Sequence, residues 1–483
     1  MKKPPEHSPK LIARSWRHVL HSQLARAEGL IEGAATTPTE DRVAHATQAI
    51  LRASVCALSD NFANALHHLR TPESFAHLPR SQAILFRTLI KFASWKTGSL
   101  NTIKHLPGDL HEGSGKRERA LHGLSKTVDA AIALQRLKFA SASRLANDAL
   151  ALSTKANNEG LCGGLLPAVV LAQIHYEHGQ LRQAESSIAS RLLLAHTNLC
   201  PEAAIRAFTL LARISAHKRH YDVALGLLDR CEAMAQRRGW LRVEAECLLA
   251  RCDILRCVDD HRNATACVHR LERLNEKANP HSAAIQRAVL LARSTLPIHF
   301  STGRLAHELH RAQIQAIAED DKYAAARLSV ALIEVFAATD DDQKALLELL
   351  KVLDVGVKAG LHQLFIDAGS AFERLLVALS TDKSSLLHRR RGLQSYVGTL
   401  LSARRASHQP AAPDMSGAAL QHLSGRERGV LMLIRRGYSN KEVAEALQIT
   451  PETVKSHAKR LFEKLDARTR AQAVSKAEHL GLI

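Results

Sequence analysis

Aromatic residues are scarce in this chain, and their scarcity narrows the fold class. Only 4% of the 483 residues are Phe, Trp or Tyr, whereas hydrophobic residues as a whole make up 46%. Strands are enriched in aromatic and β-branched side chains, while helices that pack through Ala and Leu are not. With 23% charged residues the composition is globular, and the apolar side chains suffice for a core. We therefore expect an all-α fold.

No cysteine pattern in the sequence suits a metal ion or a disulfide framework. The eight cysteines include no Cys-x-x-Cys pair, and the even spacing of Cys247, Cys252 and Cys257 fits neither kind of site. We expect reduced, mostly buried thiols. The histidines are scattered, and a surface or capping position is the expectation for each of them. We predict no metal ion and no cofactor.

Long apolar runs are also lacking. The first residues, MKKPPEHSPK, lead into no apolar signal core, and no run of 18 uncharged residues occurs anywhere. We expect a soluble, cytoplasmic protein without a membrane partner.

The motifs of common enzyme sites are missing as well. The segment GSGKR at 113–117 lacks the spacing of a P-loop and the hydroxyl that would hold magnesium. The segment HELH at 307–310 places its second histidine three residues after the first, whereas a zincin helix needs four. Paired carboxylates and a nucleophile elbow are not found either. We expect no catalytic residues, no enzyme activity and no ATP-driven switching.

The formal net charge of +19 favours polyanions as partners, because Lys and Arg displace the counterions condensed on nucleic acid. A uniformly solvated basic surface explains the same charge equally well. Residues 418–483 hold twelve Lys and Arg against seven Asp and Glu, so most of the excess lies upstream. The charge therefore suggests a class of partner without locating its site.

The middle of the chain, residues 128–380, has a repeated organisation. Amphipathic helices are expected there in pairs, whose first helices begin near residues 128, 165, 201, 240, 281, 322 and 362. Three turns share one pattern, which ends in a small residue that lets the second helix approach the first: Gly179-x-Leu181-x-x-Ala184, Arg219-x-Tyr221-x-x-Ala224 and Asp340-x-Asp342-x-x-Ala345. The pattern resembles the tetratricopeptide superfamily in a degenerate form. The resemblance implies an α-solenoid.

Two further segments flank this solenoid. Residues 1–127 have less regular helical patterns, which predict an N-terminal helical cap or degenerate repeats, with helices around Leu11–Leu30, Arg42–Leu58 and Gln82–Trp95. Residues 381–418 include SARRASHQPAAPDMS at 402–416, a composition that buries too little surface to fold. We expect a flexible linker there, followed by a separate domain at 419–483.

The last domain carries four helix-start signals. Ser424, Ser439 and Thr469 each precede a Glu or Gln by three residues, which is the spacing of a capping box. Thr450 directly precedes Pro451, and proline is well tolerated at the first position of a helix. We therefore predict four short helices.

Residues 439–458 have the pattern of a helix-turn-helix. The first helix has an apolar stripe, Ile449 fills the core at the turn, and the second helix has two faces. The apolar residues are Val443, Ala444 and Leu447 on the first helix, and Val454, Ala458, Leu461 and Leu465 on the second. The opposite face of the second helix holds Glu452, Lys455, Ser456 and Lys459, as expected of a helix that enters the major groove.

This domain resembles the LuxR-type DNA-binding domain nearly position for position. The matching segments are Leu423-Ser424-x-Arg426-Glu427-x-x-Val430-Leu431, Gly437-x-Ser439-Asn440-Lys441-Glu442-Val443-Ala444, Thr453-Val454-Lys455-x-His457 and Lys464-Leu465. Asp466-Ala467 departs from the Gly and β-branched residue usual in the family. The resemblance implies double-stranded DNA as partner, with Lys455, Ser456 and Lys459 near base edges and Thr450, Thr453 and Arg460 near phosphates. Asn440 and Lys441 complete the expected interface.

The last helix has two apolar faces, of which one must pack inside the domain. In LuxR-like proteins the fourth helix makes the dimer contact, so the resemblance implies a homodimer through Ala473, Ala477 and Leu480. The alternative is that both faces are edges of the core.

A second resemblance lies before the linker. Ala359-Gly360-Leu361-x-x-Leu364-Phe365-Ile366-Asp367-x-Gly369, followed by Leu375-Leu376, is similar to the end of the repeat region in MalT-like regulators. The family implies that the repeats bind an effector or a protein partner, although this sequence lacks the family's ATPase motif. We expect a sequence-specific transcriptional regulator. The alternative is an interaction scaffold whose terminal domain mainly dimerises.

Overall fold

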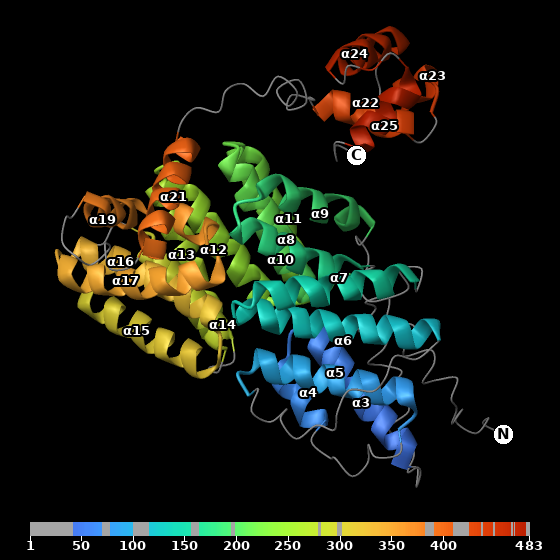
Figure 1. Cartoon of the computed structure of the whole chain (residues 1–483). Coiled ribbons are helices and arrows are strands. Elements are labelled where there is room, and N and C mark those ends of the chain that lie inside the picture. Colours follow the sequence, from blue (N-terminus) through green and yellow to red (C-terminus); the bar gives the residue numbers. More distant parts are fainter. Residues whose placement is uncertain are drawn as a thin grey trace. The chain divides into compact units, whose positions relative to one another are not determined.

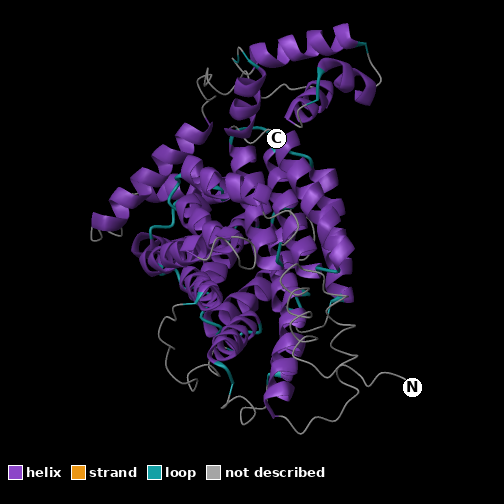
Figure 2. Cartoon of the chain, turned by 90° about the vertical axis from the view of Figure 1, so that its right-hand side faces the viewer, coloured by secondary structure: helices purple, strands orange, loops and turns teal. Residues whose placement is uncertain are grey.

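The computed structural model describes residues 42–69, 78–99, 115–155, 164–194, 199–278, 282–296, 302–381, 391–408, 425–435, 438–447, 450–464, 467 and 469–479. It separates into two compact units, which divide after Arg404. All regular elements within these ranges are helices (Figure 2). The all-α prediction is therefore confirmed for the described residues. None of their helices is both long and apolar enough to cross a membrane.

The first unit is built from consecutive helices that form antiparallel pairs (Figure 1). They are α3 (Arg42–Leu58), α4 (Phe62–His68), α5 (Arg80–Lys96), α6 (Lys116–Gln135), α7 (Phe139–Lys155), α8 (Leu165–Glu177), α9 (Leu181–Leu194), α10 (Pro201–His217), α11 (Tyr221–Arg238), α12 (Leu241–Cys257), α13 (His261–Lys277), α14 (Ala283–Ser294), α15 (Thr302–Ala318), α16 (Lys322–Ala338), α17 (Asp342–Ala359), α18 (Gln363–Ile366), α19 (Ser370–Thr381) and α21 (Arg391–His408).

The predicted starts of the first helices agree with the structure in the middle of the array and fail at its ends. Helices α8, α10, α12, α14 and α16 begin within two residues of the expected positions. The expected start near 128 is wrong, because α6 begins at Lys116 and the predicted boundary at 127 falls inside it. The start near 362 leads only into the four-residue helix α18. The helix expected at Leu11–Leu30 lies outside the described residues.

One turn geometry joins many of these helices. A residue with positive φ is followed five positions later by a buried alanine whose N–H bonds to the residue after the turn. The left-handed positions are Asp60, Leu137, Gly179, Arg219, Asp259, Asp320 and Asp340. Non-glycine residues pay roughly 1–2 kcal/mol for this conformation. The alanines are small enough for the two helices to touch, which confirms the role expected for them at three of these turns.

The predicted linker at 381–418 is wrong in part. Helix α21 occupies 391–408, and Leu393, Val397, Leu400 and Leu401 form a stripe buried against the repeats. Arg404, only 2% exposed, donates from Nη1 to the carbonyl oxygens of the α18 segment at 2.7 to 3.0 Å. The helical spacing of these apolar residues explains why this segment folds as a helix and packs on the repeats. Residues 382–390 and 409–418 of the expected linker lie outside the described residues.

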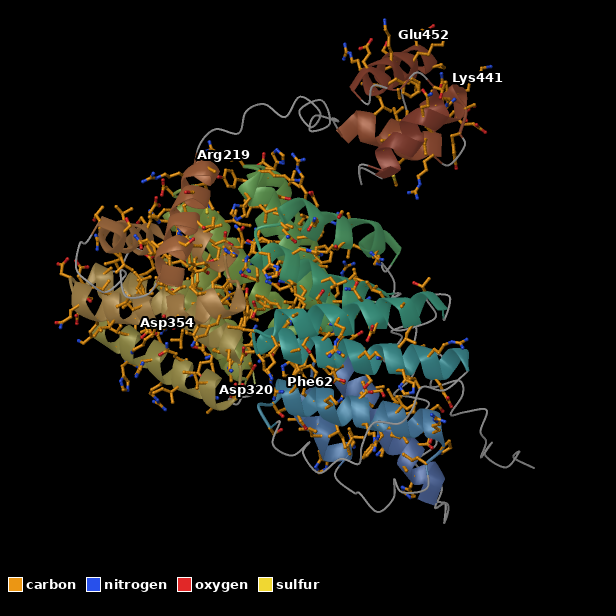
Figure 3. The ribbon with its side chains drawn as sticks, viewed as in Figure 1. Phe62, Arg219, Asp320, Asp354, Lys441 and Glu452 are labelled. Carbon is orange, nitrogen blue, oxygen red and sulfur yellow. The ribbon has the colours of Figure 1, made fainter. Side chains whose placement is uncertain are left out.

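The first helices of successive pairs pack side by side and form an inner layer, α6, α8, α10, α12, α14 and α16. The inner layer is curved, so that α16 near its end contacts α6 at its beginning. Leu134 and Ile174 lie in the same buried cluster as Val352 and Phe365. At another place, the indole N–H of Trp240 donates to the carbonyl of Leu58 at 3.0 Å, across 182 positions of sequence. Figure 3 labels Phe62 and Asp320 on the side where the N-terminal helices approach α15 and α16.

A half-buried carboxylate, Asp367, lies where the superhelix closes. Tyr176 Oη donates to its Oδ2 at 2.6 Å across 191 positions, and Gln363 Nε2 donates to Oδ1 at 2.8 Å. His217 Nε2 lies 2.7 Å from the same Oδ1. Burial opposes ionisation of Asp367, yet the contacts with His217 outweigh it and lower its pKa to about 2. Burial also opposes the charged His217 ring, but Asp367 raises the pKa of His217 overall.

A second acid, Glu177, lies next to this contact and is fully buried. Its Oε1 accepts hydrogen bonds from Tyr323 Oη at 2.5 Å and Gln173 Nε2 at 2.7 Å, and its backbone carbonyl accepts from the N–H of His362 at 2.8 Å. Because no cation pairs with this side chain among the described residues, burial dominates and raises the pKa of Glu177 to about 7.

We predict that Asp367→Asn destabilises the first unit by about 1–3 kcal/mol, because it removes the charged partner of His217 and Tyr176 in a partly buried network. Urea unfolding of the full chain, followed by circular dichroism, measures this. Asp222→Asn serves as the control, since Asp222 is exposed on α11. Equal midpoints for the two variants would contradict a role of Asp367 in closure.

We predict that Glu177 makes stability fall as pH rises. A carboxyl with a raised pKa binds its proton more tightly when folded, so its contribution is full below pH 4.5 and is lost as pH approaches 7. Between pH 5 and 8 the loss amounts to about 2 kcal/mol. Glu177→Gln keeps an acceptor for Tyr323 and should flatten this part of the stability profile. An unchanged profile in that variant would show that another group is responsible.

Candidate nucleic-acid interface

The second unit contains four short helices, as the sequence predicts: α22 (Gly425–Arg435), α23 (Asn440–Leu447), α24 (Pro451–Lys464) and α25 (Arg470–His479). They enclose one small core, made of Val430, Leu431, Ile434, Val443, Ala444, Val454, Ala458, Leu461, Ala467, Ala473 and Ala477. The apolar stripes expected on α23 and α24 therefore face inward where they are described. Ile449 and Leu465 lie outside the described residues.

Three of the four predicted helix starts have the expected hydrogen bonds. Ser439 and Glu442 form a reciprocal capping box, in which the Ser439 N–H donates to Glu442 Oε2 at 2.6 Å and the Glu442 N–H donates to Ser439 Oγ at 3.4 Å. Thr450 Oγ1 accepts from the Thr453 N–H, and Thr469 Oγ1 accepts from the Gln472 N–H, both at 3.2 Å. The start at Ser424 lies outside the described residues.

One face of α24 is polar, exposed and rich in cations. Lys455, Ser456, Lys459 and Arg460 are all exposed, which follows from the burial of Val454, Ala458 and Leu461 on the other side of the helix. Lys455 Nζ lies 3.0 Å from Glu452 Oε1, with side chains 61% and 77% exposed. An exposed ion pair of this kind is weak. Lys455 is therefore free to exchange Glu452 for a phosphate or a base edge.

The structure brings Asn440 next to this face. Asn440, at the start of α23, lines a shallow hollow together with Lys455 and Lys459 of α24. Lys441 does not line that hollow and projects from α23 into solvent, as does Glu452 from α24 (Figure 3). The hollow extends along α24 to Phe462 and Glu463. This neighbourhood of α23 and α24 is the part of the site that sequence periodicity does not reveal.

The two threonines at the start of α24 have a structural task in addition to the one expected of them. Their hydroxyl oxygens lie 2.8 Å apart, and Thr450 also caps the helix. One hydroxyl proton is used between them, so one remains to donate to an outside acceptor. Phosphate binding at a helix N-terminus is consistent with this arrangement.

The expected dimer face on α25 is wrong for the two alanines. Ala473 and Ala477 are fully buried in the domain's own core, while Val474 of the other stripe is only partly buried against it. A side chain without exposed surface in one chain cannot form the contact with a second. Leu480 lies outside the described residues. An ordinary helical wheel shows two stripes here but does not tell which one faces the core.

The geometry of the two units defines the class of the protein. A superhelix of paired helices is joined in one chain to a helix-turn-helix with an exposed basic helix face, which is the form of a helical-repeat DNA-binding protein.

Comparison with known proteins agrees. Residues 46–382 match the family described as the MalT-like TPR region, and residues 421–477 match bacterial regulatory proteins of the luxR family. The chain therefore belongs to the MalT-like TPR family, and its second unit is a LuxR-type helix-turn-helix.

Curated relatives share parts of the chain. The HTH-type transcriptional regulator AlkS of Ectopseudomonas oleovorans is 25% identical over 207 residues, which cover 42% of this chain and 22% of AlkS. The response regulator protein VraR of Staphylococcus aureus is 46% identical over 61 residues, which cover 13% of this chain and 29% of VraR. The chain thus spans less than a third of the length of either relative.

We predict that Ser439→Ala speeds hydrogen exchange of the α23 amides about fivefold in the full chain, since an N-cap contributes about 1 kcal/mol. Ser439→Asp is the matched variant, because aspartate also caps helices and should leave exchange nearly unchanged. Mass spectrometry of deuterated α23 peptides measures both. If alanine and aspartate behaved alike, the capping box would have no energetic role.

Proposed function

We propose that the protein is a sequence-specific transcriptional regulator in which α24 reads the major groove of double-stranded DNA. The observation that carries this proposal is the exposed face of α24, where Lys455, Ser456 and Lys459 project away from the core. Lys side chains donate to guanine O6 and N7, and Ser pairs with several base edges. Arg460, Thr450 and Thr453 lie nearer the helix flanks and are proposed to bind phosphates. Asn440 and Lys441 extend the contact from α23.

We further propose that the protein binds DNA as a homodimer on two half-sites. Two copies double the number of base contacts and set the half-site spacing. Because Ala473 and Ala477 are buried in the core, the proposed dimer contact uses other, exposed side chains.

The superhelix is proposed to sense an effector or to dock a partner. Its inner layer surrounds a cavity of about 680 Å³, a volume typical of small-molecule sites. Binding there would change the stability of the closed form and so supply a signal.

We predict that Lys455→Ala and Lys459→Ala each weaken binding to the specific site by about 1–3 kcal/mol. The site is first selected from random DNA with the full-length protein at two salt concentrations, and affinities are then measured by fluorescence anisotropy. Lys351→Ala is the control, because it removes the same charge from α17, where its side chain is 72% exposed.

Sequence-specific binding by α24 predicts two results. The same DNA motif is selected at both salt concentrations, and the two α24 variants lose affinity for it whereas the control does not. Binding to all sequences that falls steeply with salt would mean that only charge attracts DNA. Unchanged affinity in both lysine variants would remove α24 from the reading face.

A further inference from the structure

The cavity inside the superhelix is lined at one level by most helices of the inner layer. Gln135 comes from α6, Gln173 from α8, Arg213 from α10, Arg287 from α14 and Arg327 from α16. Residues of the α3–α4 turn and the end of α5 complete the wall. Because these helices come from different repeats, the cavity exists only when the superhelix is closed.

Most of the charged side chains in this cavity hold one another. Glu202 accepts from Lys96 at 2.6 Å, and from Arg206 and Arg242 at 3.1 Å each. Arg242 also pairs with Asp60 at 2.8 Å, and Arg287 pairs with Glu319 at 2.9 Å. These pairs brace neighbouring helices and leave little charge for a ligand.

Arg327 differs from them. It lies one turn after Tyr323 on the same face of α16, is half-buried, and has no carboxylate within ion-pair distance among the described residues. Arg213, across the cavity wall on α10, has Asp253 at 3.2 Å as its carboxylate partner. Arg213, Tyr323 and Arg327 all line the cavity, and both arginines are close enough for their charges to act on Tyr323.

The part of the cavity lined by Arg213 and Arg327 therefore has more cationic than acidic groups. Over the whole lining of the cavity, six Lys and Arg face five Asp and Glu. Of the two remaining acids, Asp321 lies 3.9 Å from Arg287, and the charge of Glu246 on α12 acts on Arg242. Neither forms an ion pair with Arg327. A guanidinium in a partly desolvated cavity is costly without a counter-charge, and its planar donors match a carboxylate or a phosphate.

We propose that this cavity binds a small organic anion whose carboxylate or phosphate group is held by Arg327 and Arg213. Gln173 and Thr209 also line the cavity; because their N–H and O–H donors are used within the protein, they offer acceptor oxygens to the rest of the ligand. This inference rests on the sensing role proposed above and gives its ligand a chemical class. Tyr323 donates to Glu177, whose backbone carbonyl accepts from His362 in the closing segment, so a ligand beside Tyr323 stabilises the closed superhelix.

Thermal unfolding of the full-length protein tests the proposal without DNA. The probes are succinate, citrate, inorganic phosphate and glucose 6-phosphate at constant ionic strength, with uncharged glucose as the matched control. We expect a saturable rise of Tm with at least one anionic probe and none with glucose. A flat response to all four anions, or an equal response to glucose, would overturn the proposal.

Variants then locate the binding site. Arg327→Gln removes no ion pair, should fold normally, and is expected to weaken probe binding about tenfold or more, whereas Arg327→Lys keeps the charge and should lose less. Arg304→Gln is the control, because that side chain is 82% exposed on α15 and does not line the cavity. Wild-type affinity in Arg327→Gln, or an equal loss in Arg304→Gln, would refute the site.

Operator affinity of Arg327→Gln, measured without any probe, separates this inference from the proposed function. Loss of probe binding with wild-type operator affinity supports the anion site. Probe binding that depends on Arg327 supports the anion site even if the protein has no specific operator. Probe binding that is independent of Arg327 overturns the anion site and leaves DNA reading untouched.

Discussion

The first unit depends on closure around Asp367. This carboxylate joins Tyr176 of α8 and His217 of α10 to the short helix α18, although 191 and 150 positions separate the partners. A row of stacked helix pairs needs only neighbour contacts to form, and such a row by itself is an open array. Closure converts it into a wall that surrounds a cavity. Arg404 of α21 then fixes the closing segment from outside through three backbone carbonyls.

The two units use cations in opposite ways. On α24 the lysines are exposed, and in the proposed function they meet the phosphates and base edges of DNA. In the cavity the arginines are partly desolvated, and most of them form ion pairs with carboxylates. Arg327 has no such ion pair among the described residues, so its charge favours binding of an anion there. The same overall basic charge therefore includes exposed lysines and partly buried arginines, and composition cannot distinguish them.

Much of the fold could be predicted, and the failures have physical causes. The buried alanine of the turns at 179, 219 and 340 was recognisable because a small residue is required there. The turns at Asp60, Leu137, Asp259 and Asp320 have the same alanine five positions later, and only the backbone geometry shows that they belong to the same class. Helix α21 was missed because the Ala-, Pro- and Ser-rich stretch overlaps its end, while its leucine stripe begins earlier, at Leu393. On α25, periodicity gave two stripes of similar strength, and only packing against Val454 and Leu461 selects Ala473 and Ala477.

The sequence alone determined most of the repeat helices, the caps of α23, α24 and α25, and the outward face of α24, because these depend on hydrogen bonds and side-chain periodicity within about four residues. It also determined the LuxR-type unit, whose short motif places each polar residue by helix geometry. Tertiary structure decided the closure, the cavity and the lone Arg327, because each depends on which side chains meet across 150 or more positions. Such meetings follow from the summed curvature of many repeats, and no local pattern records that sum.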